Sequence, residues 1–225
     1  MTAISTPSFA DVIKSRFSVR AFKSEPVPKK VLDEVFGLAN CTPSNCNTQP
    51  WAVHVASGTA LETLRQAIPP LMLGGTTTMD FPYDGQYHGV YKERQREAAR
   101  VLFEAMEIAR EDKEKRGAAF MRNFSFFDAP HVAFLFMPQE HSLREAMDVG
   151  MYAQSLMLSL TACGLGSCPQ TSLGFHADLV REVLGVDASF KLLFGISFGY
   201  VDETALANRC RTARAAVDEN TVFHQ

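Results

Sequence analysis

The chain has 225 residues, and its 25 acidic and 22 basic side chains give a formal net charge of −3. With 46% hydrophobic and 21% charged residues, the composition is typical of a globular protein with one sizeable core. Nucleic acids and anionic membranes are attracted by an excess of Lys and Arg, which this chain lacks. We therefore expect neither as a partner. Five cysteines without C-x-x-C or zinc-ligand spacing are expected to be reduced, and we predict no metal site.

The first ten residues contain no basic segment followed by an apolar run, which predicts a cytoplasmic chain without a signal peptide. The charge-free stretch between Asp148 and Asp178 is interrupted by polar residues and by breakers such as Gly164 and Pro169. Its helical part falls short of the roughly 20 apolar residues that span a bilayer. We therefore expect a buried helix in the core or at a subunit interface.

The elements follow one another along the chain without a break in composition. Helix-start signals at Thr6 and Ser8 predict a short amphipathic helix, and alternation over 16–21 predicts an extended segment. The elements expected next are a helix over 31–40, a loop over 41–50, a strand over 51–56, a helix over 61–68 ended by two prolines, an excursion over about 71–125 that contains a long charged helix over 90–116, a strand over 132–137, a helix over 143–163, a short strand over 167–171, a helix over 177–184, a strand over 192–200 and a polar arm over 201–225.

No repeat, low-complexity tract or linker divides the chain, which predicts a single domain over 1–225 of the α+β or α/β class. Gly164-x-Gly166 is followed by Ser-Cys-Pro rather than by a helix. It therefore lacks the context of the dinucleotide-binding fingerprint, and a Rossmann site is not expected.

The first candidate site is the extended segment, where Arg16, Ser18 and Arg20 share one face. Two guanidinium groups and a hydroxyl suit an anion, because guanidinium binds phosphate through paired hydrogen bonds. The alternative is a solvated strand edge, since most charged residues lie on the surface.

The second candidate is the polar loop Pro43-Ser44-Asn45-Cys46-Asn47, which leads into the strand that begins near Trp51. A loop rich in amides and hydroxyls on a rigid support can line a flat heteroaromatic ring. Asn and Ser side chains that merely bond their own backbone are the alternative.

The third candidate is the basic tail from Asn208 to Arg214, for which a solvated tail is the alternative. The chain lacks a nucleophile elbow, a P-loop and an H-E-x-x-H pair. The sequence therefore offers binding clusters but no constellation of catalytic side chains.

Together these segments resemble the flavin-dependent nitroreductase family. Four landmarks carry the resemblance, in the expected order and over nearly the whole chain: Arg16-Phe17-Ser18-Val19-Arg20-Ala21-Phe22, Pro43-Ser44-Asn45-Cys46-Asn47-Thr48-Gln49-Pro50-Trp51, Gly164-Leu165-Gly166-Ser167-Cys168-Pro169-Gln170 and Asn208-Arg209-Cys210-Arg211. Each landmark alone is weak, but four in register identify the chain as a member.

The resemblance implies an α+β homodimer with a mixed central sheet flanked by helices, C-terminal arms swapped between subunits and two FMN molecules at the interface. Arg16 and Ser18 would hold the FMN phosphate with Arg211, and Arg209 is a further candidate for this contact. Arg20 would approach the ribityl chain or the pyrimidine edge of the ring. Part of the polar loop would serve the flavin of the other subunit. The full implied cofactor set is Arg16, Phe17, Ser18, Arg20, Pro43, Ser44, Asn45, Asn47, Pro169, Gln170, Thr171, Ser172, Arg209 and Arg211.

At the ring, the backbone of 169–172 would lie near the flavin N5. Thr171-Ser172 stands where some members have Glu-Gly, which leaves the contacts to the nicotinamide open. The implied reaction is hydride transfer from NADH or NADPH to N5 and then to a nitroaromatic substrate in a ping-pong cycle, without a catalytic side chain.

Substrate contacts are expected from aromatic residues of the excursion. The candidates for an aromatic wall are Phe81, Tyr83, Tyr87, Tyr91, Phe120 and Phe124, although packing in a dimer interface explains each residue equally well. The alternative activities are quinone reduction, reductive dehalogenation or oxidative flavin fragmentation on the same fold, and a flavin-binding protein without catalysis is the non-enzymatic alternative.

Overall fold

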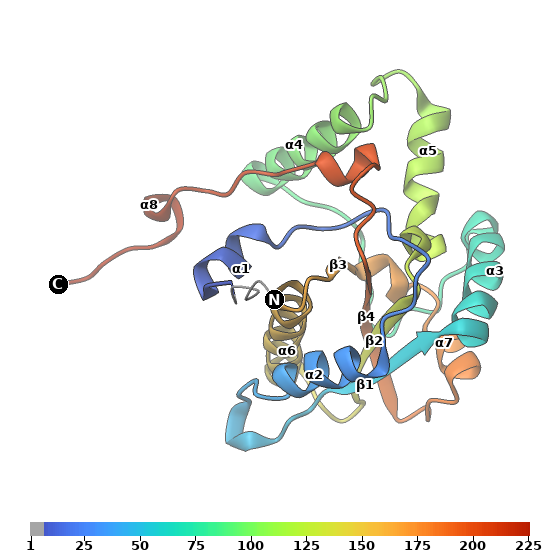
Figure 1. Ribbon diagram of the computed structural model, residues 1–225, viewed down its shortest axis with the longest axis vertical. Helices are drawn as coiled ribbons and strands as arrows, with labels where there is room; N and C mark the ends of the chain where they lie inside the picture. The colour runs from blue at the N-terminus through green and yellow to red at the C-terminus, as the bar shows by residue number, and fades with distance from the viewer. Residues whose placement is uncertain (1–6) are drawn as a thin grey trace, which may run out of the picture.

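Helices cover both faces of one four-stranded sheet in the computed structural model, which describes residues 7–225 (Figure 1). The helix-start signal at Thr6 and most of the stretch considered for a signal peptide lie outside the described residues. Helix α1 (Phe9–Ser15) begins at the second signal, where Ser8 and Asp11 form a capping box. No helix of residues 7–225 is long and apolar enough to cross a membrane.

The sheet has the order β1-β2-β4-β3, and every pair of neighbours is antiparallel. Its strands are β1 (Ala52–Ser57), β2 (His131–Pro138), β3 (Gly166–Gln170) and β4 (Phe190–Gly199). The predicted α+β class is confirmed. The mixed character that we expected is confined to one parallel bridge between Ser18 and Ser167, because the next bridge of this segment, between Phe22 and Val201 beyond the end of β4, is antiparallel.

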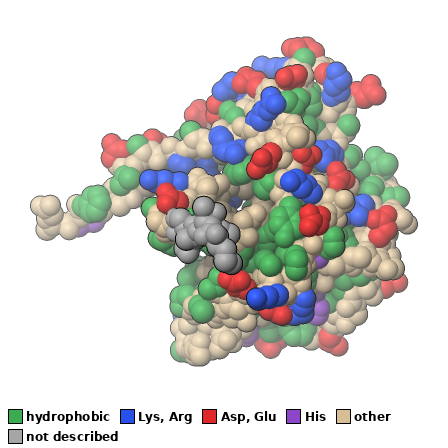
Figure 2. All heavy atoms as spheres, viewed as in Figure 1, with side chains coloured by type: hydrophobic (Ala, Val, Ile, Leu, Met, Phe, Trp, Pro, Cys, Tyr) green, Lys and Arg blue, Asp and Glu red, His purple; other side chains and the backbone are tan. Residues whose placement is uncertain are grey.

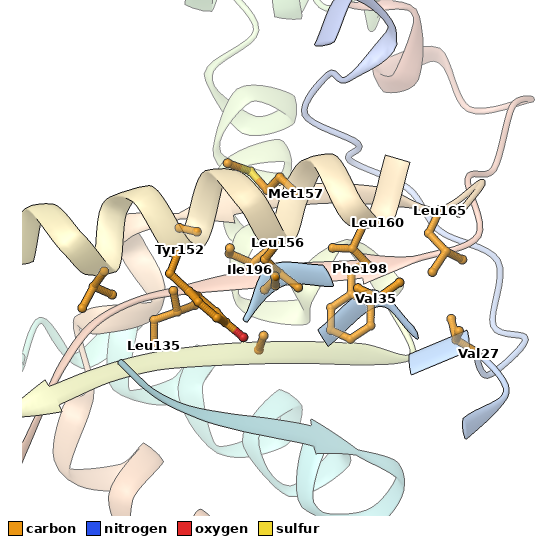
Figure 3. Packing of buried hydrophobic residues seen from close by; sticks show 14 of the residues in the cluster. Val27, Val35, Leu135, Tyr152, Leu156, Met157, Leu160, Leu165, Ile196 and Phe198 are labelled. Atoms are coloured by element: carbon orange, nitrogen blue, oxygen red, sulfur yellow. The ribbon is translucent and has the colours of Figure 1, made fainter. Parts of the chain in front are cut away.

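The core lies on both sides of β2, in which residues 131–137 are all buried. On one face, Ala133 and Leu135 pack against α2 (Lys29–Ala39) and α6 (Leu143–Ala162). Figure 3 shows side chains of α6 directed toward the strands, as predicted for a core helix. On the other face, Phe134 and Phe136 pack against α3 (Gly58–Gly74) and α7 (Ala177–Leu184).

Two predicted helix boundaries are wrong. Helix α3 continues through Pro69 and Pro70, because the φ of proline fits a helix and Met72 beyond them packs on the core. The predicted helix over 90–116 is two helices, α4 (Gly89–Ala105) and α5 (Lys113–Met121). It breaks because Asp112 caps a new helix by accepting a hydrogen bond from the Lys115 N–H at 2.9 Å.

Short turns and the C-terminal arm complete the chain. The turns are η1 (Asn45–Asn47), η2 (Arg122–Asp128), η3 (Thr171–Gly174) and η4 (Leu206–Arg209). Beyond η4 the arm extends away from the body and contains α8 (Val217–Asn220) (Figure 1). An ion pair of 3.3 Å between Arg94 and Glu219 connects the arm to α4.

Candidate functional site

A cleft of 540 Å³ lies where α1, the extended segment, α6 and the beginning of the arm meet. Figure 2 shows basic side chains at the base of the arm. The cleft therefore joins residues from the two ends of the sequence. Its lining consists of Ile13, Lys14, Arg16, Phe17, Ser18, Arg20, Gln154, Cys210, Arg211, Thr212 and Arg214.

The extended segment is held against the sheet edge. The Val19 N–H donates to the Ser167 carbonyl at 3.0 Å, and the Val19 side chain is buried. Side chains alternate along an extended chain, and Arg16, Ser18 and Arg20 line the cleft on the side away from Val19, although Phe17 also reaches the lining. This placement is the one that the alternation predicted.

Asn208 joins the arm to the extended segment. Its Oδ1 accepts a hydrogen bond from the Arg20 N–H at 2.7 Å, and its Nδ2 donates to the carbonyls of Ala21 and Asp202, each at 2.8 Å. The side chain is only 6% exposed. Asn208 thus fixes the backbone on both sides of the cleft.

Arg211 crosses the cleft toward Phe17. Its guanidinium carbon lies 3.5 Å from the centre of the Phe17 ring, which is a close cation–π contact. Its Nη1 donates to the carbonyls of Asn208 and Cys210 at 2.8 and 2.9 Å. The guanidinium is therefore oriented by the protein itself.

The cleft is strongly cationic. Lys14, Arg16, Arg20, Arg211 and Arg214 line it, and no Asp or Glu is among the lining residues. Burial lowers the pKa of Arg16, and the neighbouring Arg214 lowers it further. An anion with several acceptor oxygens, such as the FMN phosphate, fits this set of donors.

Arg209 was expected in the same cluster, but the structure does not bring it into the cleft. It is exposed in the last turn of η4, directly after buried Asn208. Neighbouring residues of a tight turn point in different directions, so the inward position of Asn208 leaves Arg209 outside. Sequence reasoning missed Lys14 and Gln154, for which it had no signal. Arg214 belongs to the basic tail predicted as the third candidate site but was not in the implied cofactor set.

The amide loop, residues 43–49, does not line the cleft. Cys46, Asn47 and Gln49 have φ values of 50°, 56° and 48°, a left-handed conformation that non-glycine residues rarely adopt. One hydrogen bond ties the loop to α6, from the Asn45 N–H to Asp148 Oδ2 at 3.1 Å. The side chains of the loop therefore point outward, away from the core of this chain.

The end of β3 offers mainly backbone. Pro169 and Thr171 are exposed and Ser172 is half-buried, whereas Gln170 is 4% exposed. Gln170 Oε1 accepts from Ser197 Oγ at 2.5 Å, and Nε2 donates to the Asn123 carbonyl at 3.0 Å. The Gln170 side chain is therefore occupied inside the protein.

The predicted aromatic wall is not continuous. Phe81 and Tyr83 line a cavity of 230 Å³ with Thr171, whereas Phe120 lines a separate cavity of 120 Å³ with Arg20. Tyr87 is in neither lining, and its hydroxyl lies 3.3 Å from that of Tyr83.

Besides Tyr87, two further members of the expected wall lie outside these cavities, for opposite reasons. Tyr91 is 64% exposed. Phe124 is fully buried beneath Phe120, at 5.6 Å between ring centres, so its prediction as a substrate contact is wrong. In residues 7–225, no group of three or more His, Cys, Asp or Glu side chains is arranged to hold a metal ion.

Comparison with known proteins identifies related sequences. The family model described as Nitroreductase family matches residues 13–200. Nitroreductase NfnB of Mycolicibacterium smegmatis is 46% identical over 213 residues, which cover 94% of this chain and 91% of that protein. A 4-nitrobenzoate reductase of Pseudomonas putida is 33% identical over 228 residues, with 98% and 97% covered.

Solved structures agree in fold. The FMN-dependent nitroreductase NfnB from Mycobacterium smegmatis, crystallised in complex with NADPH, superposes with a TM-score of 0.90 at 45% identity and covers 95% of this chain and 96% of its own. The FMN- and NADPH-dependent nitroreductase NfnB from sphigopyxis sp. strain HMH gives a TM-score of 0.93 at 31% identity, with 97% and 100% covered.

Proposed function

The chain belongs to the nitroreductase family, and from this premise we propose that it is an FMN-dependent enzyme that uses NAD(P)H to reduce nitroaromatic compounds. The observation that carries the proposal is the cleft lined by five cations and no carboxylate. When bound, FMN supplies the hydride chemistry between nicotinamide and nitro group. The protein then has to bind and orient the flavin and the substrate and to shield them from water. This role agrees with a sequence that lacks a nucleophile elbow and an H-E-x-x-H pair.

In this proposal the extended segment and the arm together hold the phosphate. Arg16 and Arg211 would bind its oxygens through their guanidinium groups, and Ser18 would add a hydroxyl donor. Arg20, further along the segment, would lie toward the ribityl chain or the ring. The Arg211 guanidinium is already oriented by Phe17 and two carbonyls, so little ordering is needed on binding.

A second copy of the chain would complete the site. Leu143, Met147 and Met151 recur every four residues on α6 and are 77%, 58% and 44% exposed, so they form one apolar stripe. Phe9 of α1 and Phe223 of the arm are 72% and 79% exposed. We propose that a homodimer covers these surfaces and swaps the arms, with the amide loop facing the flavin of the partner subunit.

The substrate would stack near residues that line the two small cavities. Phe81 and Tyr83 provide flat aromatic surface beside the hydroxyl of Thr171, and Phe120 does so beside Arg20. Such surfaces suit planar, electron-poor rings. The relative from Pseudomonas putida is a 4-nitrobenzoate reductase, and we propose nitrobenzoates among the substrates of this chain.

Anaerobic flavin reduction tests this function. FMN-loaded protein should bleach on addition of NADH or NADPH, and a nitroaromatic should restore the yellow colour faster than a quinone does. Protein that stays colourless with added FMN, or flavin that stays oxidised with both nicotinamides, would contradict the proposal. Faster reoxidation by quinones would instead favour quinone reduction.

A double substitution tests the phosphate assignment. Arg16→Ala with Arg211→Ala should abolish FMN retention and leave the far-ultraviolet circular dichroism unchanged. Arg96→Ala with Arg110→Ala removes the same charge from exposed positions outside the cleft and should retain FMN. Full retention in the first variant would refute the assignment.

A further inference from the structure

We propose that Asp80 is a positioning residue that determines which aromatic rings the enzyme accepts, because it fixes the cavity that Phe81 and Tyr83 line with Thr171. The inference rests on the proposed function and concerns the nitroaromatic substrate of that function. Asp80 itself is absent from the lining of both small cavities and of the cationic cleft. It therefore acts through the residues that follow it in the chain.

Three segments form the walls of this cavity of 230 Å³. The first wall is residues 79 and 81–83 of the excursion, the second is η3 with Phe175, and the third is Leu192 and Leu193 of β4. None of the lining residues carries a charge. An apolar cavity of about 150 Å³ binds benzene. The cavity therefore has room for one aromatic ring with a small substituent.

Asp80 connects the first wall to the third. Its Oδ2 accepts a hydrogen bond from the Leu192 N–H at 2.7 Å. The Asp80 carboxylate also accepts from Nη1 and Nη2 of Arg181 in α7, at 2.5 and 3.1 Å. Arg181 in turn donates to the carbonyl of Phe190 in β4 at 3.1 Å. Two elements of the body thus hold this carboxylate with three hydrogen bonds.

Thr78 connects the first wall to the second, since its N–H donates to the Phe175 carbonyl at 2.8 Å. Beyond Asp80, in contrast, the hydrogen bonds found for residues 81–87 stay within that stretch. Asp80 is therefore the last point at which hydrogen bonds tie the excursion to the body before the chain lines the cavity.

The ion pair is largely shielded from water, with the side chains of Arg181 and Asp80 only 13% and 14% exposed. The hydrogen bonds with Asp80 raise the pKa of Arg181 above its ordinary value. Loss of Asp80 leaves Arg181 with Asp178, which is exposed, as its remaining carboxylate partner. It also removes the side-chain bonds that connect residue 80 to α7 and β4, so the first wall should move outward and widen the cavity.

The experiment compares a one-ring and a two-ring substrate. FMN-loaded enzyme is assayed with nitrobenzene and with 1-nitronaphthalene, and the kcat/KM for nitrobenzene is divided by that for 1-nitronaphthalene. This ratio does not depend on the fraction of folded enzyme, so a merely structural loss leaves it unchanged. In Asp80→Ala the ratio should fall by about fivefold or more, because the widened cavity admits the second ring.

Asp178→Ala is the matched control. Asp178 Oδ1 accepts from Nη2 of the same Arg181 at 2.6 Å, but this exposed residue does not line the cavity. Its loss removes the same charge, and the ratio should change by less than about twofold. FMN retention should match the wild type in both variants, because neither residue lines the cationic cleft.

Arg181→Lys keeps the positive charge but cannot pair with both oxygens of Asp80. The ratio should fall in this variant too, by a smaller factor, and it decides the question if Asp80→Ala does not fold. An unchanged ratio in folded protein would overturn the role of Asp80.

Two further outcomes would also speak against Asp80. Equal falls in Asp80→Ala and Asp178→Ala would report only the charge beside α7, and a wild-type ratio near one would mean that the cavity does not select between the rings. A wild-type enzyme that reduces neither nitroaromatic would instead contradict the proposed function and with it this inference. Wild-type turnover beside an unchanged ratio in the variants contradicts the inference alone.

Discussion

The cationic cleft and the amide loop differ in how firmly the rest of the chain holds them. Around the cleft, Asn208 makes two hydrogen bonds to the distant backbone of residues 20 and 21 and a third to nearby Asp202, Val19 bonds the sheet edge, and Arg211 stacks on Phe17. The amide loop has one hydrogen bond to the body, from Asn45 to Asp148. Its other bonds lie within the loop, such as that from the Gln49 N–H to Ser44 Oγ at 2.8 Å.

The difference indicates which part of the proposed site is already in place in a single chain before a ligand binds. The cleft brings its donors together before a ligand arrives, which lowers the entropic cost of binding. The conformation of the loop is held by hydrogen bonds within the loop, and its amide side chains are exposed. This exposure is what the proposed contact with a second chain requires. Helix α6 contributes to both regions, through Gln154 at the cleft and Asp148 at the loop, about 9 Å apart along the helix axis.

The largest effect is expected from Asn208→Ala. It leaves the half-buried Arg20 N–H without its acceptor and removes one of the two hydrogen bonds that the Ala21 carbonyl accepts, which should lower the free energy of unfolding by about 3 kcal/mol. FMN affinity should fall as well, because the two sides of the cleft separate. Urea unfolding measures the first effect, with Asn220→Ala, an exposed residue of the arm, as the control. A loss below about 1 kcal/mol would show that the cleft does not depend on Asn208.

The next largest effect is expected from removing the hydrogen bond between the amide loop and α6. Asp148→Ala should speed hydrogen exchange of the Asn45 amide by about tenfold, because an opening that costs about 1.4 kcal/mol less is ten times more populated. Asp148→Asn keeps an oxygen acceptor and should exchange nearly as slowly as the wild type. Equal exchange in all three proteins would mean that the loop is held by its internal bonds alone.

Acid should weaken the segment that links the two regions. The Val27 N–H, on the way from the cleft to α2, donates to His131 Nε2 at 2.9 Å, so the neutral ring carries its proton on Nδ1 and donates it to Ser57 Oγ at 2.5 Å. Burial lowers the pKa of His131 below its ordinary 6.5. The unfolded chain therefore binds the proton first, and stability falls as the pH drops below 6.5, by up to about 1.4 kcal/mol per pH unit.

Urea midpoints at about pH 8, 6.5 and 5.5 measure this loss, in a range above the pKa values of ordinary carboxylates. His54→Gln serves as the control. Burial also lowers the pKa of His54, but this half-buried ring makes no hydrogen bond among those found in residues 7–225, and most of the acid loss should remain in the variant. Stability that is constant from pH 8 to 5.5 would contradict the role of His131.

The smallest effect is expected within the loop itself. Ser44→Ala removes the acceptor for the Gln49 N–H at an exposed turn and should cost about 0.5 kcal/mol in urea unfolding. Thr48→Ala, at a neighbouring exposed position whose side chain makes no hydrogen bond found in residues 7–225, should cost less. A cost above about 2 kcal/mol for Ser44→Ala would mean that the loop is coupled to the core after all.

The pattern of residues along the chain was sufficient to predict features that depend only on the direction of side chains within one element. The alternation over 16–21 placed Arg16, Ser18 and Arg20 on one face because extended chain has a period of two, and the structure agrees. The apolar run over 132–137 likewise predicted a strand buried on both faces, which is β2.

Tertiary contacts decided the rest. Which arginine of the tail enters the cleft depends on the hydrogen bonds of Asn208, and these join positions 188 residues apart. Phe124 lies between Asn123 and Ser125 in the sequence, yet η2 places it in the core beside Phe126, in a turn where Phe126 and Phe127 have left-handed φ values of 59° and 54°. The spacing of apolar residues in the sequence does not predict such a left-handed turn of the backbone.

The bonds of Asn208 also have a consequence for the order in which the chain is made. During synthesis, residues 16–20 emerge early, but the other wall of the cleft does not exist until the ribosome has added residues 202–214. Contacts between such distant positions form late, because the intervening chain must be closed into a loop first. A chain terminated before residue 202 would lack the second wall of the cleft and, under the proposed function, should not retain FMN.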